Sequence, residues 1–504
     1  MARLKEYNDH YCESEYEYAF IGFLEAEGWK YSSGNNIRRV TKRDVLIVDD
    51  FKKFIADINP DLTEDEVTQV YDNVRLVGAE SDFATLHKVY GWMVNGVQFT
   101  PQDGLPRMIP LIEFDNWDKN IFRVVNQFTV EYTNNGQKEN RRPDVLLFVN
   151  GMPLCVIELK NPADANATIY DAWEQINIRY WRDIPHLLHY CPLACISDGV
   201  KTRLGTVRTP YEHFYAWRRV NEGDVVSTLP FAETETMIKG VYTPERFVEI
   251  FRDYIYFQDS IYDSDEVEIV CRYPQFFAAK LLKQSIVNSV VTRSGKGGTY
   301  FGATGCGKTY TMAFLARQLA LRCTDIPEIG SPTIILIVDR DELQKQGSKL
   351  FTKSKEFLNL GEVSVVKNRT QLRQELGARQ SGGFYICTIQ KFCDREDDKI
   401  GLINDRQNII CFSDEAHRTQ LEHSKKIQFS KDADENMKAM VSKPYAKVLK
   451  EAFPHATFVG FTGTPIAETY QTFGDEIDRY TMDQAVADGL TVSIKYHPRI
   501  AKVL

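Results

Sequence analysis

The sequence GATGCGKT at residues 302–309 constrains the fold of this chain more than any other stretch. It fits the pattern G-x-x-x-x-G-K-[ST], whose glycines let backbone N–H groups close around phosphate oxygens at a helix N-terminus. We expect Lys308 to reach the β- and γ-phosphates of a nucleotide and Thr309 to hold Mg²⁺. The alternative is a plain glycine turn between a strand and a helix. The predicted nucleotide-binding residues of this loop are Gly302, Ala303, Thr304, Gly305, Cys306, Gly307, Lys308 and Thr309.

Length and composition are typical of a globular chain of several domains. With 504 residues, about three domains of roughly 150 residues are expected. The ten cysteines are scattered without a C-x-x-C pair, which disfavours zinc and disulfide frameworks. The polar start and the lack of a long apolar stretch predict a cytoplasmic protein without a membrane partner. A formal net charge of −9 argues against indiscriminate coating of nucleic acid but allows a local basic stripe.

Four short apolar runs in the second half of the chain each end in polar residues. Continuous apolar strands that alternate with helices predict a parallel sheet covered on both faces. Functional residues of such sheets collect at the carboxyl ends of the strands. The runs cover residues 333–338, 384–388, 408–412 and 456–461.

The third run leads into Asp414-Glu415-Ala-His. Beside a phosphate loop, Asp414 is expected to hold Mg²⁺, and Glu415 to polarise the water that attacks the γ-phosphate. The alternative is that these polar residues only cap a helix. This alternative is weakened because a phosphate loop precedes them and the Thr-Gly-Thr-Pro sequence at 462–465 follows them. Upstream of the loop, Gln275 can read an adenine edge through its amide group.

A second candidate site lies in a strand-rich stretch of the first half. The expected strands cover residues 122–132, 144–149 and 154–160, with turns at Asn134-Asn135-Gly136 and Asn150-Gly151. The second turn brings Asp144 back beside Glu158 and Lys160, which period-two alternation places on one face. Two carboxylates and a lysine suit metal-assisted phosphodiester hydrolysis, with Asp144 and Glu158 on Mg²⁺ and Lys160 at the attacking water.

The alternative for these residues is a set of surface charges that flank a buried hairpin. However, Glu158 interrupts an otherwise apolar strand, and a buried carboxylate is costly unless it has a partner such as Lys160 or a metal. An amphipathic helix is predicted over residues 13–29. Its acids either form a solvated face or, at Glu15 or Glu17, point toward this site.

The first half resembles the PD-(D/E)xK nuclease core. The resemblance rests on Pro143-Asp144, Glu158-Leu159-Lys160, a helix at 167–180 and a strand at 193–197. The second half resembles superfamily-2 helicase-like motors, which also carry a glutamine where this chain has Gln275. Taken together, the chain resembles the restriction-and-translocation subunit, HsdR, of Type I restriction enzymes.

The resemblance implies an α/β fold in which a nuclease domain precedes a RecA-like parallel α/β motor domain. The family's nuclease carries a Gln-x-x-x-Tyr element, whereas here one more residue separates Gln175 from Tyr180. Gln175 is therefore carried over as a catalytic residue, and the equivalence of Tyr180 stays open. The implied domains are a PD-(D/E)xK-like endonuclease at 1–230, a connector at 231–268, a first RecA-like ATPase at 269–470 and, at 471–504, the start of a connection to a missing second motor domain.

The implied function is ATP-dependent translocation and cleavage of double-stranded DNA, with Mg²⁺, as the restriction subunit of a complex with methyltransferase and specificity subunits. Residues 388–391 and 339–343 would follow the phosphates of one DNA strand, while another subunit reads the sequence. The implied catalytic residues are Asp144, Glu158, Lys160, Gln175 and Glu415, and the implied metal ligands are Asp144, Glu158, Thr309 and Asp414.

The chain looks like an N-terminal fragment, and without the second motor domain it is expected to bind ATP–Mg²⁺ but to hydrolyse ATP poorly and not to translocate. Two other functions stay open. One is a nuclease-helicase of another defence system, such as a Type III restriction subunit. The other is an ATP-dependent DNA-binding scaffold with a vestigial nuclease.

Overall fold

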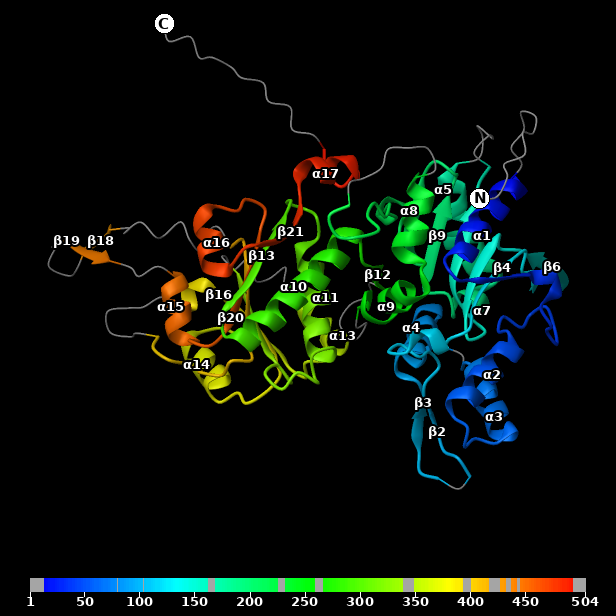
Figure 1. Ribbon diagram of the computed structural model, residues 1–504, viewed down its shortest axis with the longest axis horizontal. Coiled ribbons are helices and arrows are strands. Elements are labelled where there is room, and N and C mark those ends of the chain that lie inside the picture. Colours follow the sequence, from blue (N-terminus) through cyan, green and yellow to red (C-terminus); the bar gives the residue numbers. More distant parts are fainter. Residues whose placement is uncertain are drawn as a thin grey trace, which may run out of the picture. The chain divides into compact units, whose positions relative to one another are not determined.

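The computed structural model divides the chain into two compact units (Figure 1). The first unit comprises residues 1–257 and 265–273, and the second comprises residues 258–264 and 274–504. The structure describes residues 13–78, 80–102, 104–161, 168–224, 232–258, 266–338, 349–392, 400–416, 427–431, 437–441 and 445–492.

A six-stranded mixed sheet forms the centre of the first unit, in the order β1-β4-β7-β8-β9-β10. The β1–β4 and β8–β9 pairs are parallel, and the other neighbours are antiparallel. Every residue of β7 and β8 is buried, so this hairpin is the core of the unit. The strands of the first unit are β1 (Lys30–Ser33), β2 (Val97–Phe99), β3 (Arg107–Ile109), β4 (Phe122–Asn126), β5 (Val130–Asn134), β6 (Gln137–Arg141), β7 (Val145–Val149), β8 (Met152–Leu159), β9 (Leu193–Ser197), β10 (Thr202–Thr206), β11 (Ile255–Phe257) and β12 (Glu268–Val270).

Helices of the first unit pack on this sheet: α1 contacts β1, β4 and β8, and α5 contacts β8 and β9. A π-helical turn, η3 (Gln175–Tyr180), continues α5. The helices are α1 (Glu13–Ala26), α2 (Val48–Ile58), α3 (Glu64–Arg75), α4 (Asp82–Asn95), α5 (Ile169–Glu174), α6 (Trp181–Asp183), α7 (Pro185–Leu188), α8 (Ala232–Val241) and α9 (Pro244–Asp253), with 3-10 turns η1 (Gly34–Asn36), η2 (Trp117–Lys119) and η4 (Tyr211–His213).

The two expected hairpin turns are confirmed, with left-handed backbone at Asn135 (φ 48°) and Asn150 (φ 51°), each followed by glycine. The single strand expected at 122–132 is wrong. Gln127 takes a left-handed conformation (φ 53°) and breaks the stretch into β4 and β5. Its N–H donates a hydrogen bond to the carbonyl oxygen of Asp144 at 3.1 Å. Asp144 directly precedes β7, the neighbour of β4 in the sheet, so this contact stabilises the break.

Residues 232–257 fold within the first unit, although the sequence analysis assigned residues 231–268 to a connector. α8 contacts α1 and β10, and α9 contacts α8 and β11. A Cβ atom on Gly240 would lie 2.3 Å from the Trp217 ring, so α8 approaches that ring more closely than any larger residue would allow.

A seven-stranded sheet forms the centre of the second unit, in the order β15-β16-β14-β17-β20-β13-β21. All of its neighbours pair in parallel, which confirms the sheet expected from the apolar runs. β21 lies beyond residue 470, where the sequence analysis ended the motor domain. The strands are β13 (Lys296–Gly302), β14 (Thr333–Val338), β15 (Val363–Val365), β16 (Phe384–Thr388), β17 (Ile409–Asp414), β20 (Thr457–Thr462) and β21 (Glu476–Tyr480), with a separate antiparallel pair β18 (Ile427–Lys431) and β19 (Met437–Val441).

Helices flank this parallel sheet, and α16 contacts both β13 and β20. Among the described residues, none of the helices combines the length and the apolar character that crossing a membrane requires. The helices are α10 (Tyr273–Thr292), α11 (Lys308–Leu321), α13 (Lys355–Leu358), α14 (Arg369–Gly377), α15 (Tyr445–Ala452), α16 (Ala467–Phe473) and α17 (Met482–Ala487), with a 3-10 turn η6 (Ile389–Phe392).

Candidate functional site

The phosphate loop joins the end of β13 to the start of α11. Gly305 and Gly307 both have left-handed backbone, with φ of 82° and 86°, a conformation that favours glycine. A Cβ atom on Gly307 would lie 2.6 Å from Nε2 of Gln275, so a side chain there would also clash. The loop therefore needs its glycines for both backbone shape and space.

Lys308, Asp414 and Glu415 converge beside this loop. The Nζ atom of Lys308 donates to the carbonyl oxygen of Gly302 at 3.2 Å and lies 3.8 Å from Oε1 of Glu415. Burial raises the pKa of the Asp414 carboxyl, and the Glu415 carboxylate adds to this effect while the Lys308 ammonium opposes it. One cation and two acids thus meet beside the loop that the sequence predicts to bind a nucleotide.

Glu415 has a left-handed backbone with φ of 47°. Such a conformation in a residue other than glycine costs roughly 1–3 kcal/mol and is concentrated at functional sites. The N–H group of Glu415 donates to Oδ1 of Asp414 at 3.0 Å, which supports the tight turn after β17. The backbone thus turns sharply between the two acids that the sequence analysis singled out.

Two further predicted elements contact the phosphate loop. Gln275 is only 3% exposed, and its Nε2 donates to the carbonyl oxygen of Gly307 at 3.3 Å. A Cβ atom on Gly463 would lie 3.3 Å from both the carbonyl oxygen of Gly302 and Oγ1 of Thr304. The Thr-Gly-Thr-Pro loop after β20 therefore packs directly on the phosphate loop, and Thr309 follows Lys308 at the start of α11.

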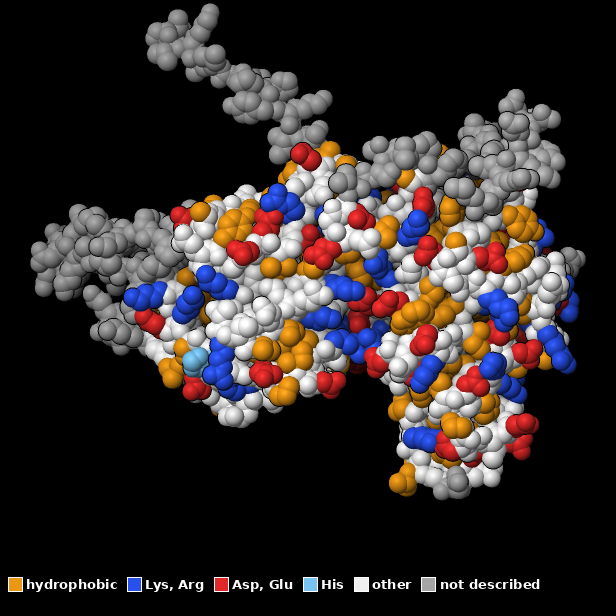
Figure 2. All heavy atoms as spheres, in the orientation of Figure 1, with side chains coloured by type: hydrophobic (Ala, Val, Ile, Leu, Met, Phe, Trp, Pro, Cys, Tyr) orange, Lys and Arg blue, Asp and Glu red, His pale blue; other side chains and the backbone are white. Residues whose placement is uncertain are grey.

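The residues expected to follow DNA phosphates are partly described. Residues 388–391 lie where β16 passes into η6, at the carboxyl edge of the sheet, with Thr388 buried and Gln390 exposed. The other expected contact, residues 339–343, lies outside the described residues, as does His417, the last residue of the Asp-Glu-Ala-His sequence. Figure 2 shows basic and acidic side chains interspersed over the visible face of the first unit.

The candidate nuclease site is built around Glu158, a fully buried carboxylate near the end of β8. Its Oε1 accepts a hydrogen bond from the hydroxyl of Tyr180 at 2.6 Å, and its Oε2 accepts one from Nε2 of Gln175 at 2.7 Å. The backbone N–H of Asp144 also donates to Oε1, at 3.4 Å. The carboxylate of Glu158, although buried in an apolar strand, therefore accepts three hydrogen bonds.

Lys160 and Asp144 complete this cluster. The Nζ atom of Lys160 donates to Oε1 of Gln175 at 3.0 Å, so Gln175 bridges the lysine and Glu158. Oδ2 of Asp144 accepts a hydrogen bond from the N–H of Leu159 at 2.9 Å. Lys160 is an expected partner of Glu158, but the hydrogen bond of its ammonium group goes to the bridging amide of Gln175.

Electrostatics at Glu158 suit a cation. Burial raises the pKa of the Glu158 carboxyl well above its usual range, and the Asp144 carboxylate adds to this effect while the Lys160 ammonium opposes it. Two neighbouring carboxylates, one of them fully buried, repel each other when both are ionised. Carboxylate oxygens are ligands that Mg²⁺ prefers, and Asp144 and Glu158 supply them here, without a third acidic, histidine or cysteine ligand among the described residues.

The π-helical turn explains the unusual spacing of Gln175 and Tyr180. In an α-helix, residues five apart point about 140° away from each other, on different faces. In η3 they lie on the same face, and Nε2 of Gln175 is 2.8 Å from the hydroxyl of Tyr180. Tyr180 thus joins the cluster despite the extra residue, a role that sequence reasoning left open because a π-turn has no clear sequence signal.

Of the two acids considered in α1, Glu17 is buried and Glu15 is exposed. Glu17 accepts hydrogen bonds from Nδ2 of Asn126 at 2.6 Å and from Nε2 of Gln127 at 2.7 Å. Because the N–H of Gln127 donates to the carbonyl oxygen of Asp144, Glu17 supports the backbone from which Asp144 extends.

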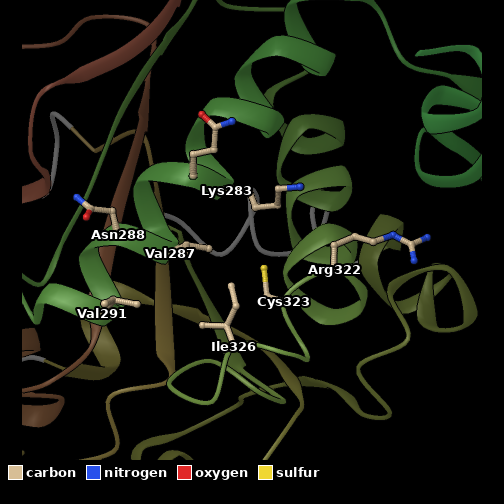
Figure 3. Close-up of a pocket in the computed structure, with 8 residues that line it drawn as sticks. Lys283, Val287, Asn288, Val291, Arg322, Cys323 and Ile326 are labelled. Carbon is tan, nitrogen blue, oxygen red and sulfur yellow. The ribbon is translucent and has the colours of Figure 1, made fainter. Parts of the chain in front are cut away.

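A cavity of about 420 Å³ lies on the second unit, between α10 and the segment that follows α11 (Figure 3). Its described lining is mainly apolar, with Lys283 and Arg322 on one side and no carboxylate. α11 starts at the phosphate loop, and its far end reaches the cavity. Its fourteen residues make the helix about 21 Å long. The cavity is therefore separate from the nucleotide site.

Comparison with known proteins assigns a family model to each half of the chain. Residues 11–213 match the type I restriction enzyme R protein N terminus, and residues 274–504 match the SWI2/SNF2 ATPase. The first match contains the Asp144 cluster, and the second contains the phosphate loop.

Two curated relatives match nearly the whole chain. The type I restriction enzyme HindI endonuclease subunit of Haemophilus influenzae is 31% identical over 96% of this chain and 46% of its own length. A putative type I restriction enzyme endonuclease subunit, MjaIXP, of Methanocaldococcus jannaschii is 30% identical over 97% of this chain and 46% of its own length. The chain thus spans about half the length of the curated relatives it matches.

Among solved structures, a fragment of a putative HsdR subunit of a type I restriction enzyme from Vibrio vulnificus YJ016 matches 73% of this chain and 56% of its own chain. Its sequence identity is 15% and its TM-score is 0.26, which is too low to support any inference.

Proposed function

Because this chain belongs to the family of type I restriction enzyme endonuclease (HsdR) subunits, we propose that it contributes ATP-dependent translocation and cleavage of double-stranded DNA to a restriction-modification complex. The observation that carries the proposal is the connected cluster of Lys160, Gln175, Glu158 and Tyr180 beside Asp144.

For cleavage, Asp144 and Glu158 would hold Mg²⁺, which when bound stabilises charge on the transferring phosphoryl group and activates water. The ammonium group of Lys160 orients the attacking water by a hydrogen bond, and its positive charge favours the deprotonated form of that water. Gln175 holds the ammonium group of Lys160 in place through its amide oxygen while its amide nitrogen holds Glu158. Tyr180 fixes the other oxygen of Glu158, so that the carboxylate presents one orientation.

For ATP hydrolysis, the loop at 302–307 and Lys308 bind the phosphates, and Thr309 and Asp414 would hold Mg²⁺. Glu415 positions the attacking water, and Gln275 contacts the adenine. The proximity of Lys308 to Glu415, at 3.8 Å, supports a common site for these roles.

The proposed partners are double-stranded DNA and the methyltransferase and specificity subunits, the latter reading the recognition sequence. We propose a nuclease domain within the first unit and a RecA-like motor domain within the second. The cytoplasmic location stays a prediction.

The test is cleavage of unmethylated circular DNA by this chain combined with candidate methyltransferase and specificity subunits, in the presence of ATP and Mg²⁺. Cutting that requires ATP and stops on methylated DNA supports the proposal. Cutting that is independent of ATP would instead favour a separate nuclease, and ATP turnover without any cutting would favour the DNA-binding scaffold.

Removing the Tyr180 hydroxyl is expected to shift the pH dependence of cleavage. The hydrogen bond from Tyr180 favours ionised Glu158, so Tyr180→Phe raises the pKa of that carboxyl further. Because only the ionised carboxylate binds metal, the acidic limb of the cleavage profile moves to higher pH, and more Mg²⁺ is needed at neutral pH. Cleavage rates measured from pH 6 to pH 9 at several Mg²⁺ concentrations check this, and an unshifted profile contradicts it. Tyr190→Phe, at a buried tyrosine that bonds only a backbone carbonyl, is the control.

A further inference from the structure

Three aromatic rings contact one another at the surface of the first unit. Tyr170 lies 5.2 Å from Trp173 and 5.0 Å from Tyr211 between ring centroids, and Trp173 lies 6.1 Å from Tyr211. Tyr170 is 47% exposed, although it is a large aromatic residue. We refer to Tyr170, Trp173 and Tyr211 as the aromatic ledge.

The ledge is rigidly held from beneath. The indole N–H of Trp173 donates to the carbonyl oxygen of Thr209 at 2.9 Å, and the side-chain amide of Asn177 donates to the same oxygen at 3.0 Å. These bonds tie α5 and η3 to the segment that leads into Tyr211. The exposed face of Tyr170 is thereby preorganised, and a ligand that stacks on it would lose little freedom in the protein.

The ledge borders the candidate nuclease site on the side of α5. This helix packs against β8 and β9 and leads directly into Gln175 (Figure 1). The Nζ atom of Lys160 donates to Oε1 of Gln175 at 3.0 Å, so the lysine is hydrogen-bonded to the residue that directly follows this helix.

The ledge also borders this site on the side of β9. Tyr211 follows Thr209, whose carbonyl oxygen accepts the hydrogen bond from Trp173 of α5, and α5 packs against β9. The carbonyl oxygen of Ser197, the last residue of β9, accepts a hydrogen bond from the N–H of Lys160 at 2.8 Å. The aromatic surface and the catalytic lysine thus meet at one edge of the sheet.

An exposed cation stands at the same edge. Lys201 lies in the turn between β9 and β10, where its N–H donates to Oδ1 of Asp198 at 2.7 Å. Its side chain is exposed, and its ammonium group has no partner among the residues that the structure describes. Surfaces that bind single-stranded nucleic acid combine stacking aromatic rings with cations for the phosphates.

We propose that the aromatic ledge stacks on an unpaired base of the DNA beside the scissile phosphate, while Lys201 contacts the adjoining backbone. A base within a duplex has both faces covered by its neighbours, so only a base released from the stack can offer its face to Tyr170. The inference deepens the proposed nuclease function and rests on it: the nuclease acts where the two strands are locally separated.

The test uses the Lys160→Ala chain, so that binding is observed without cleavage. Its ligand is a duplex with a single-stranded gap that holds one 2-aminopurine, a base whose fluorescence falls when it is stacked. Fluorescence is expected to fall on addition of protein, and Tyr170→Ala and Tyr211→Ala are each expected to weaken this binding roughly fivefold to one hundredfold. Tyr170→Trp retains the effect, because it keeps a stacking ring.

Phe23→Ala, at another exposed aromatic residue of the first unit, is the matched control and is expected to change nothing. Unchanged fluorescence with the Tyr170 and Tyr211 variants, or the same quenching with fully paired DNA, overturns the proposal. So does a change in self-association of the Tyr170→Ala chain without loss of quenching, because the ledge would then be a contact between protein copies. The proposed nuclease function is tested separately, by cutting in the wild-type complex. The fluorescence measurements do not require cutting, so the two proposals can fail independently.

Discussion

Replacing Lys160 by alanine is expected to lower DNA cleavage by about 10²- to 10³-fold, the range lost when one positioned charge-stabilising donor is removed. In the proposed mechanism the lysine acts on the attacking water, and its ammonium group is held by Gln175 at 3.0 Å. Its loss removes a catalytic group and also a charge that favours the ionised form of Glu158. ATP hydrolysis, which we propose for the second unit, is expected to stay unchanged.

The measurement is the rate at which supercoiled, unmethylated plasmid is nicked and linearised by the reconstituted complex, with ATP turnover followed in the same samples. Lys138→Ala is the matched control, because Lys138 lies on the β5–β6 hairpin of the same unit with its side chain 77% exposed. Cleavage that survives the loss of Lys160 would remove this cluster from the reaction. Loss of ATP turnover in the same variant would indicate a folding defect instead.

Replacing Glu415 by glutamine is expected to lower ATP hydrolysis by on the order of 10²-fold or more while nucleotide binding is retained. Glutamine keeps the size of the side chain but cannot polarise water as a carboxylate does. The binding groups, which are the phosphate loop and Lys308, are left in place. Removal of the negative charge also relieves the repulsion between Glu415 and Asp414.

Single-turnover assays with enzyme in excess over labelled ATP check the hydrolysis step, and equilibrium binding of a fluorescent nucleotide checks the affinity. Glu468→Gln, at an exposed position of α16 in the same unit, is the control. Equal hydrolysis in the Glu415→Gln and wild-type chains would assign the water-positioning role to another residue. Loss of nucleotide binding in that variant would mean that Glu415 is needed to shape the loop.

Much of the second unit could be predicted from the sequence because its signals are local. Strands buried on both faces leave continuous apolar runs, and the observed β14 and β16 coincide with the runs at 333–338 and 384–388. The signal for the phosphate loop is also local, because the spacing of its glycines predicts the turn in which Gly305 and Gly307 take a left-handed backbone. The predicted nuclease residues lie together for the same reason, because the Asn150-Gly151 turn sets the register of β7 and β8.

The features that the sequence did not reveal depend on contacts between distant residues. Gln127 breaks a predicted strand because its left-handed backbone is supported by Asp144 and Glu17, and neither contact is visible in the local pattern. Tyr180 reaches Glu158 because the helix widens into a π-turn, which brings its hydroxyl to 2.6 Å from Oε1 of that buried carboxylate. The bridging role of Gln175 likewise follows from three side chains that meet in space.

The phosphate loop depends on a strand that follows it by more than 170 residues. The N–H of Ala303, the first residue after β13, donates to the carbonyl oxygen of Tyr480 at 2.9 Å, and β21 pairs along β13. A shortened version of this protein that ended before Tyr480 would expose the edge of the strand leading into its own nucleotide site. Anyone who trims the protein to a minimal ATP-binding piece should therefore place the new end after β21.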